Sequence, residues 1–254
     1  MPIFRINTDL HYFAHVPKCG GTAVEEYLSA RFGPMALQEH GRHLFPEAAR
    51  WSRTAIEHVP ALWLDRLIPA GWLQSSFAVV RHPWRRVVSA FYFRRDMARS
   101  LPPDADFNAF VRSLPDWLDR DPFRHEGHFT RQTDMIPEGS KIFRLEEGLD
   151  RIIPYLDALV GNSDGPRTIE PRNVGKWRHD QTPPVPNDET LSILARLYAG
   201  DFNRFGYPSP TRAGDLDQLA DLPVQTGTGA PLTPGKRTLI QKLHRSLQRR
   251  INQP

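Results

Sequence analysis

The order of apolar and polar positions along the chain predicts strands that alternate with helices. Short apolar runs typical of buried strands are each followed by a segment with apolar residues at helical spacing. This alternation is typical of an α/β fold with a mainly parallel central sheet flanked by helices. The strand candidates are residues 12–16, 77–80 and 141–147, and the helices that follow them lie in 23–28, 83–92 and 152–156.

Three further helices are predicted from the same pattern. Residues 54–75 have a helical apolar pattern through Leu62, Leu64, Leu67 and Ile68. Helices are also expected around residues 106–114 and, as one amphipathic helix, over 188–207.

The pattern changes after residue 207, which defines the expected domain organisation. Residues 1–207 are predicted to form one folded domain, and the Pro- and Gly-rich stretch 208–235 a disordered linker. Residues 236–254 are predicted to contain a basic amphipathic helix. Such a helix can contact an anionic membrane surface or a protein partner, and a solvated tail is the simpler alternative.

The positive charge belongs to this tail. The chain of 254 residues has a net charge of +4, and the last 19 residues contain six of its 33 basic residues and no acid. The remainder has 27 basic and 29 acidic residues, so the predicted domain is near neutral. We therefore expect no nucleic-acid partner for the domain.

Cysteine content and hydropathy indicate the expected compartment. The chain has one cysteine, Cys19, so no intrachain disulfide can form. No apolar run approaches the roughly 20 residues of a membrane span, and the N-terminus has polar residues where a signal peptide needs an apolar stretch. These features predict a cytoplasmic protein, with the tail able to hold it peripherally at the inner membrane surface.

The strongest candidate for chemistry is the turn between the first strand and its helix. It contains Lys18 and two glycines directly before the helix, an arrangement that directs backbone N–H groups toward an anion. An ordinary βα turn that uses its glycines for backbone freedom is the alternative. A second candidate follows the 77–80 strand, where Arg81 and Ser89, eight residues apart, could share one ligand at the carboxyl edge of the sheet.

Other chemistries fit this turn poorly. A nucleotide-kinase P-loop needs its lysine after the last glycine, whereas Lys18 precedes both. A cysteine phosphatase would need an arginine soon after Cys19, but Glu25 and Glu26 follow. The histidines lack the spacing of metal ligands, so we expect no metal.

The loop HVPKCGGTA and the segment VVRHPWRRVVSAFY resemble the two nucleotide-binding motifs of the sulfotransferases, most closely the carbohydrate (family 2 type) branch in a soluble, bacterial-like form. Segments at 128–134, 142–147 and 197–207 resemble the family in the same order. The resemblance implies a P-loop-like three-layer fold and the sulfate donor PAPS (3′-phosphoadenosine 5′-phosphosulfate), without a metal. It implies that Arg81 and Ser89 hold the 3′-phosphate. The 5′-phosphosulfate would be held by the loop residues Lys18, Cys19, Gly20, Gly21, Thr22 and Ala23.

The resemblance also implies catalytic roles. His58, 23 residues before Arg81, lies near the place of the catalytic base, and His43 is the reserve candidate. A loop histidine that caps the next helix is the alternative for His58. Lys18 would stabilise the leaving phosphate.

Two more residues have an expected role and a simpler alternative. Lys176 resembles a basic residue that closes over the nucleotide, or is a plain surface lysine. Glu146 would orient a catalytic or binding group, or would pair with Arg144 or Arg151.

The expected activity is therefore sulfuryl transfer from PAPS to a hydroxyl, on a glycan or glycolipid. Family members often have Ser or Thr at the positions of Cys19 and Ala23. This chain is therefore expected to lack the hydroxyl contacts of those residues and to keep the contacts of the backbone N–H groups. The alternatives are a catalytically inactive PAP- or PAPS-binding sensor or assembly protein and, less favoured, a nucleotide kinase.

Overall fold

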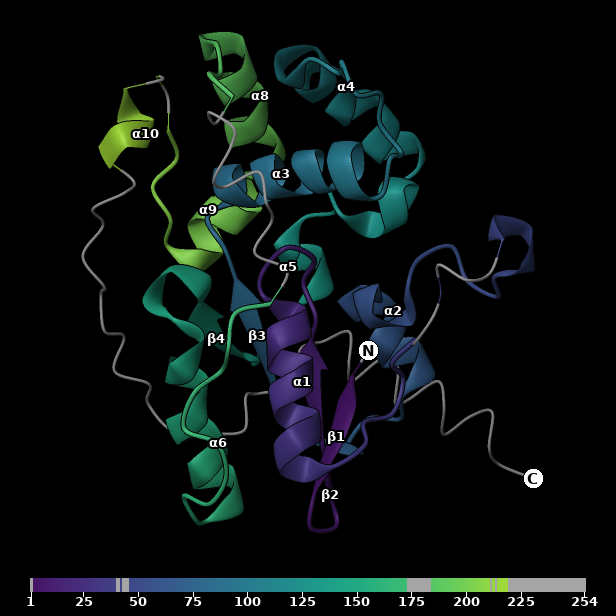
Figure 1. Cartoon of the computed structure of the whole chain (residues 1–254), viewed down its shortest axis with the longest axis vertical. Helices are drawn as coiled ribbons and strands as arrows, with labels where there is room; N and C mark the ends of the chain where they lie inside the picture. The colour runs from purple at the N-terminus through teal and green to yellow at the C-terminus, as the bar shows by residue number, and fades with distance from the viewer. Residues whose placement is uncertain are drawn as a thin grey trace, which may run out of the picture. The chain divides into compact units, whose positions relative to one another are not determined.

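The computed structural model describes residues 2–39, 42, 46–172, 184–210, 212 and 214–218. It contains a four-stranded sheet in the order β1-β2-β3-β4, flanked by helices (Figure 1), so the predicted α/β class is confirmed. The strands are β1 (Ile3–Ile6), β2 (Asp9–Ala14), β3 (Leu73–Val80) and β4 (Lys141–Arg144). The helices are α1 (Gly21–Phe32), α2 (Ala61–Leu67), α3 (Pro83–Tyr92), α4 (Phe107–Arg120), α5 (Gln132–Met135), α6 (Ile152–Val160), α8 (Asp188–Leu197), α9 (Ala199–Phe205) and α10 (Asp215–Gln218).

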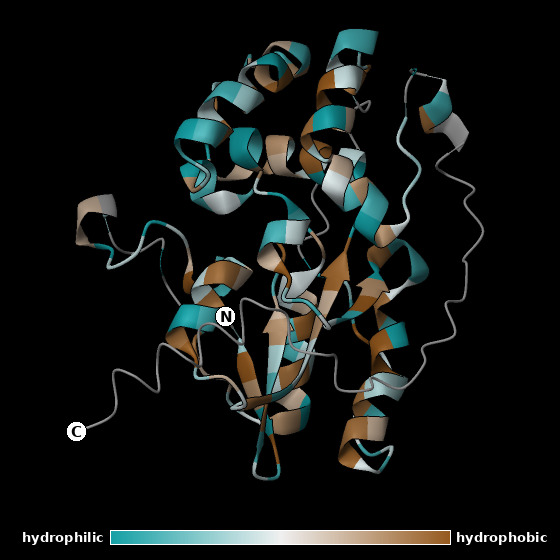
Figure 2. Cartoon of the chain, turned by 180° about the vertical axis from the view of Figure 1, so that it is seen from behind, coloured by the Kyte–Doolittle hydropathy of each residue, from teal (hydrophilic) through white to brown (hydrophobic). Residues whose placement is uncertain are grey.

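The sheet is mainly parallel. β3 pairs in parallel with both β2 and β4, and β1 pairs antiparallel with β2. Helix α1 lies in front of the strands in Figure 1 and behind them in Figure 2, so it covers one face of the sheet. The loops that follow β2 and β3 leave from the same edge because the two strands run in the same direction. This common edge positions the site described below.

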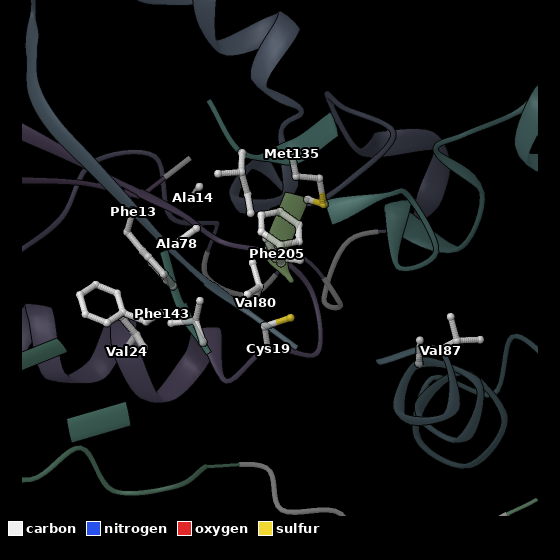
Figure 3. Packing of buried hydrophobic residues seen from close by; sticks show 14 of the residues in the cluster. Phe13, Ala14, Cys19, Val24, Ala78, Val80, Val87, Met135, Phe143 and Phe205 are labelled. Carbon is white, nitrogen blue, oxygen red and sulfur yellow. The ribbon is translucent and has the colours of Figure 1, made fainter. Parts of the chain in front are cut away.

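The core lies between the sheet and its helices, and many of its side chains are drawn in Figure 3. Phe77 stacks on Phe13 with ring centroids 5.0 Å apart and meets Phe143 edge-on at 6.0 Å. Val24 and Leu28 of α1 are fully buried in the same hydrophobic cluster. Each such aliphatic side chain contributes about 1.5–3 kcal/mol. The packing explains why the strands have continuous apolar runs rather than alternation.

The N-terminal hairpin was missed by the sequence analysis. β1 and β2 pair with Ile6 opposite Asp9, across a two-residue turn in which Asn7 has φ 54°. Asparagine tolerates this left-handed conformation, which tight hairpin turns require. The hairpin adds the antiparallel strand β1 to the sheet beside β2, ahead of the βα unit formed by β2 and α1.

The helix predicted over 188–207 is two helices in the structure. α8 ends at Leu197 and α9 begins at Ala199, and Tyr198 between them has non-helical backbone angles. The Tyr198 hydroxyl is buried and donates to the carbonyl of Phe129, 2.8 Å away. This tertiary contact accompanies the break between α8 and α9, whereas the sequence pattern alone predicts one continuous amphipathic helix.

Helix α2 has the predicted position within 54–75 but not a buried apolar stripe. Leu64 is 3% exposed, whereas Leu62 is 62% and Leu67 58% exposed. Two of the four apolar positions that predicted this helix therefore face away from the core, whereas Ile68 is partly buried against it.

The linker predicted over 208–235 contains the one-turn helix α10, and residues 219–254 lie outside the described residues. The basic tail helix over 236–254, its membrane or protein contact and the cytoplasmic location therefore stay predictions. No helix in the described part of the chain is both long and apolar enough to cross a membrane.

Candidate active site

A cavity of about 1250 Å³ opens where β2 and β3 end. Both candidate segments of the sequence analysis contribute to its wall, although more than fifty residues separate them in the chain. The predicted site residues that line it are Lys18, Gly20, Gly21, Thr22, Ala23, His58, Arg81 and Ser89.

The loop between β2 and α1 has the backbone shape of an anion-binding turn. Lys18 and Gly20 have left-handed backbone angles, with φ 68° and 82°. Helix α1 then begins at Gly21, and its first turn contains no acidic residue. The backbone N–H groups directed outward at a helix start and the positive end of the helix dipole favour a bound anion.

Gly21 leaves room for a histidine ring. A Cβ atom at position 21 would lie 2.0 Å from Nε2 of His15. The ring cannot move away easily because its Nδ1 atom lies 2.5 Å from Oε1 of Glu25 in α1. The second glycine of the loop is therefore required by close packing of His15 rather than by its backbone angles.

We expect Gly21→Ala to disrupt this loop. The added methyl group must displace either the His15 ring or the start of α1, so thermal unfolding should occur several degrees lower, since overpacking costs about 1–3 kcal/mol. Differential scanning calorimetry measures the effect. Ala23→Gly in the same helix is the control for altered helix propensity, and an unchanged melting temperature in Gly21→Ala would contradict the packing argument.

Lys18 is a partly buried cation at the mouth of the loop. Its Nζ atom lies 4.0 Å from the ring centroid of Phe93. Burial, and to a smaller extent the nearby positive charges of Arg81 and Arg94, lower the pKa of Lys18 to about 8. An anion bound here would stabilise the charged form of the lysine.

Arg81 and Ser89 form the second cationic part of the cavity. Arg81 follows β3 directly, and its backbone N–H and C=O are both bonded to the Gln132 side-chain amide, at 3.0 and 2.9 Å. Ser89 lies two turns into α3 and faces the same cavity. Arg85, one turn before Ser89, also lines the cavity and was not named from the sequence. Its spacing of four residues from both Arg81 and Ser89 was the available signal.

Cys19 points into the core instead of the cavity. It is 1% exposed and belongs to the buried hydrophobic cluster drawn in Figure 3. Its Sγ atom lies 3.4 Å from Oε1 of Gln132. Burial raises the pKa of the Cys19 thiol to about 12, so a thiolate is disfavoured. Any contact of Cys19 with a ligand would therefore be made by its backbone.

Gln132 connects the two motifs and is itself fixed by α9. Its amide bonds Arg81 and Cys19, and its backbone N–H donates to Oδ2 of Asp201 at 3.0 Å. Asp201 also accepts from the Thr133 N–H at 2.8 Å and is fully buried. The segments 128–134 and 197–207 thus support the cavity wall through the hydrogen bonds of Gln132 and Asp201.

Glu146 orients its neighbours and does not pair with Arg144 or Arg151. Its carboxylate accepts from the His82 backbone N–H and from the Tyr207 hydroxyl, both at 2.9 Å. The Arg144 guanidinium instead donates to the Phe205 carbonyl at 2.6 Å. These contacts argue against the predicted pairing with Arg144 or Arg151, and an orienting effect on a catalytic or binding group stays a prediction.

Three imidazoles stand in a row at the cavity wall. The ring of His58 lies between those of His15 and His128, with centroids 5.1 and 5.3 Å apart. His58 is partly exposed, yet enough protein surrounds its ring to lower its pKa well below 6.5. Its Nδ1 atom lies 3.3 Å from the Glu126 carbonyl, so Nδ1 carries the proton and Nε2 has the free lone pair.

The sequence analysis gave His15 no role beyond rejecting the histidines as metal ligands, and its contact with Glu25 was missed. A carboxylate at Nδ1 fixes the orientation and the tautomer of the ring, with the Nδ1 proton directed at Glu25. The pairing brings together a strand-end residue and a helix residue ten positions later, which the βα turn alone does not specify.

His43 and Lys176 lie outside the described residues. Residues 168–172, which precede Lys176, do line the cavity. Arg172 among them pairs with Glu26 at 2.6 Å. The roles of His43 and Lys176 stay predictions.

The arrangement can hold two anionic groups, one at the loop before α1 and one at Arg81 and Ser89, with an imidazole base beside the first. The family model described as "Sulfotransferase family" matches residues 3–208. This range contains every element from β1 to α9. No curated protein and no solved structure matches the chain. With this match over most of its length and a cavity of this kind at the edge of its sheet, the chain belongs to the sulfotransferase family.

Proposed function

We propose that this protein transfers a sulfuryl group from PAPS to a hydroxyl of an acceptor, a glycan or glycolipid. The observation that carries the proposal is that the Lys18 loop and the Arg81–Ser89 pair face one cavity. A donor with a 5′-phosphosulfate and a separate 3′-phosphate has two anionic groups to place, and this cavity offers two places for them.

The loop suits the phosphosulfate. Its backbone N–H groups and the start of α1 favour several anionic oxygens at once. Arg81 and Ser89 then suit the 3′-phosphate through charge-assisted hydrogen bonds. Lys176 is proposed to close over the nucleotide.

In the reaction, the acceptor oxygen forms a bond to sulfur while the bond from sulfur to the phosphate oxygen breaks. The electron pair of that bond leaves with the phosphate, which gives 3′,5′-ADP. Lys18 is placed to neutralise the charge that develops on the leaving oxygen. Positioning and positive charge provide most of the catalysis in such a transfer, and the arginines and the lysine of this cavity supply both.

The acceptor hydroxyl must lose its proton, and we assign this proton to His58. Its Nε2 lone pair is free because Nδ1–H is directed at the Glu126 carbonyl. The adjacent His15, supported by Glu25, is the second imidazole able to accept it.

A protein that binds PAP or PAPS without turnover is the second candidate. Binding needs only the loop, Arg81 and Ser89, and the lowered pKa of His58 makes its ring a weak base. Tight 3′,5′-ADP binding without transfer to any acceptor would favour this candidate.

The proposal is tested by transfer of radiolabelled sulfate from PAPS to a mixed glycan pool. We expect transfer by the wild type and a strong loss in Lys18→Ala and in His58→Ala. Full activity in both variants would contradict the mechanism, and no transfer by the wild type would leave the binding protein as the better assignment.

The role of Arg81 has a separate binding test. Arg81→Ala should weaken 3′,5′-ADP binding by about 10- to 100-fold, because a hydrogen bond to a charged group contributes about 1.5–3 kcal/mol. Binding of 5′-AMP, which has no 3′-phosphate, should change much less. Isothermal titration calorimetry with both nucleotides measures this difference, and an equal loss for the two would show that Arg81 acts elsewhere.

A further inference from the structure

A second cavity, of about 420 Å³, adjoins the first. The two share His15, Thr22, His58 and Phe93 in their walls. The proposed base His58 thus lines both cavities, whereas Arg81 and Ser89 line only the first. If the proposed function holds, this is where an acceptor can place the hydroxyl that is sulfated.

Carboxylates predominate in the wall of this second cavity. Among the described residues that line it and not the first cavity, four are glutamates and two are arginines. Both arginines are already engaged by glutamates of the same wall: Arg42 lies 2.8 Å from Glu39, and Arg50 lies 3.4 Å from Glu126. The charged residues of this wall are Glu25, Glu39, Arg42, Arg50, Glu57 and Glu126.

Glu57 differs from the other glutamates of the wall. It is 9% exposed, and its Oε1 atom accepts from the Glu39 backbone N–H at 2.5 Å. Its Oε2 atom is buried and has no hydrogen-bond partner among the residues that the structure describes. A buried carboxylate oxygen without a donor is costly, so this oxygen is suited to a donor that arrives with a ligand.

The position of Glu57 relative to the proposed base is set by the backbone. Glu57 and His58 are consecutive in the short 3₁₀ turn Ile56–His58. Both residues also line the second cavity, so an acceptor there that presents its reacting hydroxyl to His58 lies against the wall that contains Glu57. A hydroxyl or an ammonium group there would donate to Oε2, whereas a carboxylate or sulfate would be repelled.

We propose that the second cavity is the acceptor subsite and that Glu57 selects an acceptor with a hydrogen-bond donor beside the reacting hydroxyl. The acceptor class is a neutral or cationic diol or amino alcohol, as in neutral sugars and amino sugars. A polyanionic chain of uronic acids is excluded by the same carboxylate. This assignment rests on the proposed sulfuryl transfer and adds its substrate class.

The test compares three acceptors with a common aglycone: the glucoside, the glucosaminide and the glucuronide of p-nitrophenol. For the wild type we expect kcat/KM with the glucuronide to be at least about tenfold below that of the better of the other two. Glu57→Gln keeps an oxygen for the Glu39 N–H and removes the charge, so it should reduce this discrimination to within about threefold. Glu138→Gln, an exposed glutamate that lines neither cavity, is the matched control and should retain the wild-type ratio.

The affinity for 3′,5′-ADP separates misfolding from altered selection. Unchanged affinity together with lost discrimination in Glu57→Gln supports the inference. A wild type that sulfates the glucuronide as well as the other two overturns it, whether or not Glu57→Gln folds. Transfer to a mixed glycan pool but to none of the three glycosides also overturns it and leaves the proposed function standing, whereas no transfer to any acceptor overturns both.

Discussion

Replacing His58 by alanine should lower kcat for sulfuryl transfer by about 10²- to 10⁴-fold, which is the usual contribution of a general base. The affinity for 3′,5′-ADP should stay within about threefold, because the proposed contacts of the 3′-phosphate are Arg81 and Ser89, and His58 also lines the second cavity, which those two do not. Single-turnover rates with saturating PAPS measure this loss without interference from product release.

The same experiment separates His58 from His15. If His58 is the base, Glu25→Gln should have a small effect, since it changes only the support of the neighbouring ring. A loss in Glu25→Gln as large as that in His15→Ala, with His58→Ala close to wild type, would transfer the role to the His15–Glu25 pair.

The pH profile gives an independent check on this assignment. A base acts in its neutral form, so activity rises with pH through the pKa of the base and is level above it. Because burial lowers the pKa of His58 well below 6.5, the acidic limb of kcat/KM should lie below pH 6.5. An acidic limb above that pH would contradict His58 as the base.

Lys18→Ala should lower kcat by about 10²- to 10³-fold, as for the loss of one preorganised group that stabilises a developing anion. The lysine lies in the loop that faces the cavity, and other groups there hold the remaining phosphate oxygens. Lys141→Ala in β4, a lysine outside both cavities, is the matched control. A kcat of Lys18→Ala within threefold of the control would remove Lys18 from the mechanism.

The lowered pKa of Lys18 should add an alkaline limb to the pH profile of kcat/KM. The charged lysine is the active form, and its pKa is about 8 in the free protein, so kcat/KM should fall as the pH rises through 8. Bound PAPS favours the charged form, so the corresponding limb of kcat should lie at higher pH. Lys18→Arg should lack the limb near pH 8, because a guanidinium stays charged; persistence of the limb would assign it to another group.

Local signals were sufficient for much of the fold. Parallel strands buried on both faces require continuous apolar runs, so the 77–80 run predicted β3, and Pro83 marked the first turn of α3. The hairpin turn at Asn7 was also a local signal but was not used. The break between α8 and α9 has no such signal, since the buried Tyr198 hydroxyl reaches the distant Phe129 carbonyl.

By itself the sequence determined the groups suited to anions and their order: the Lys18 loop before a helix, and Arg81 followed by Ser89 two helical turns later. Short-range geometry is enough for this, because a βα turn and a helical repeat depend on neighbouring residues. Only the tertiary structure decided that Cys19 is turned into the core by Gln132, that Glu25 supports His15, and that Glu57 has an oxygen without a described partner. These relations join residues on different elements or depend on burial. Burial and long-range contacts arise only when the strands, helices and loops pack together.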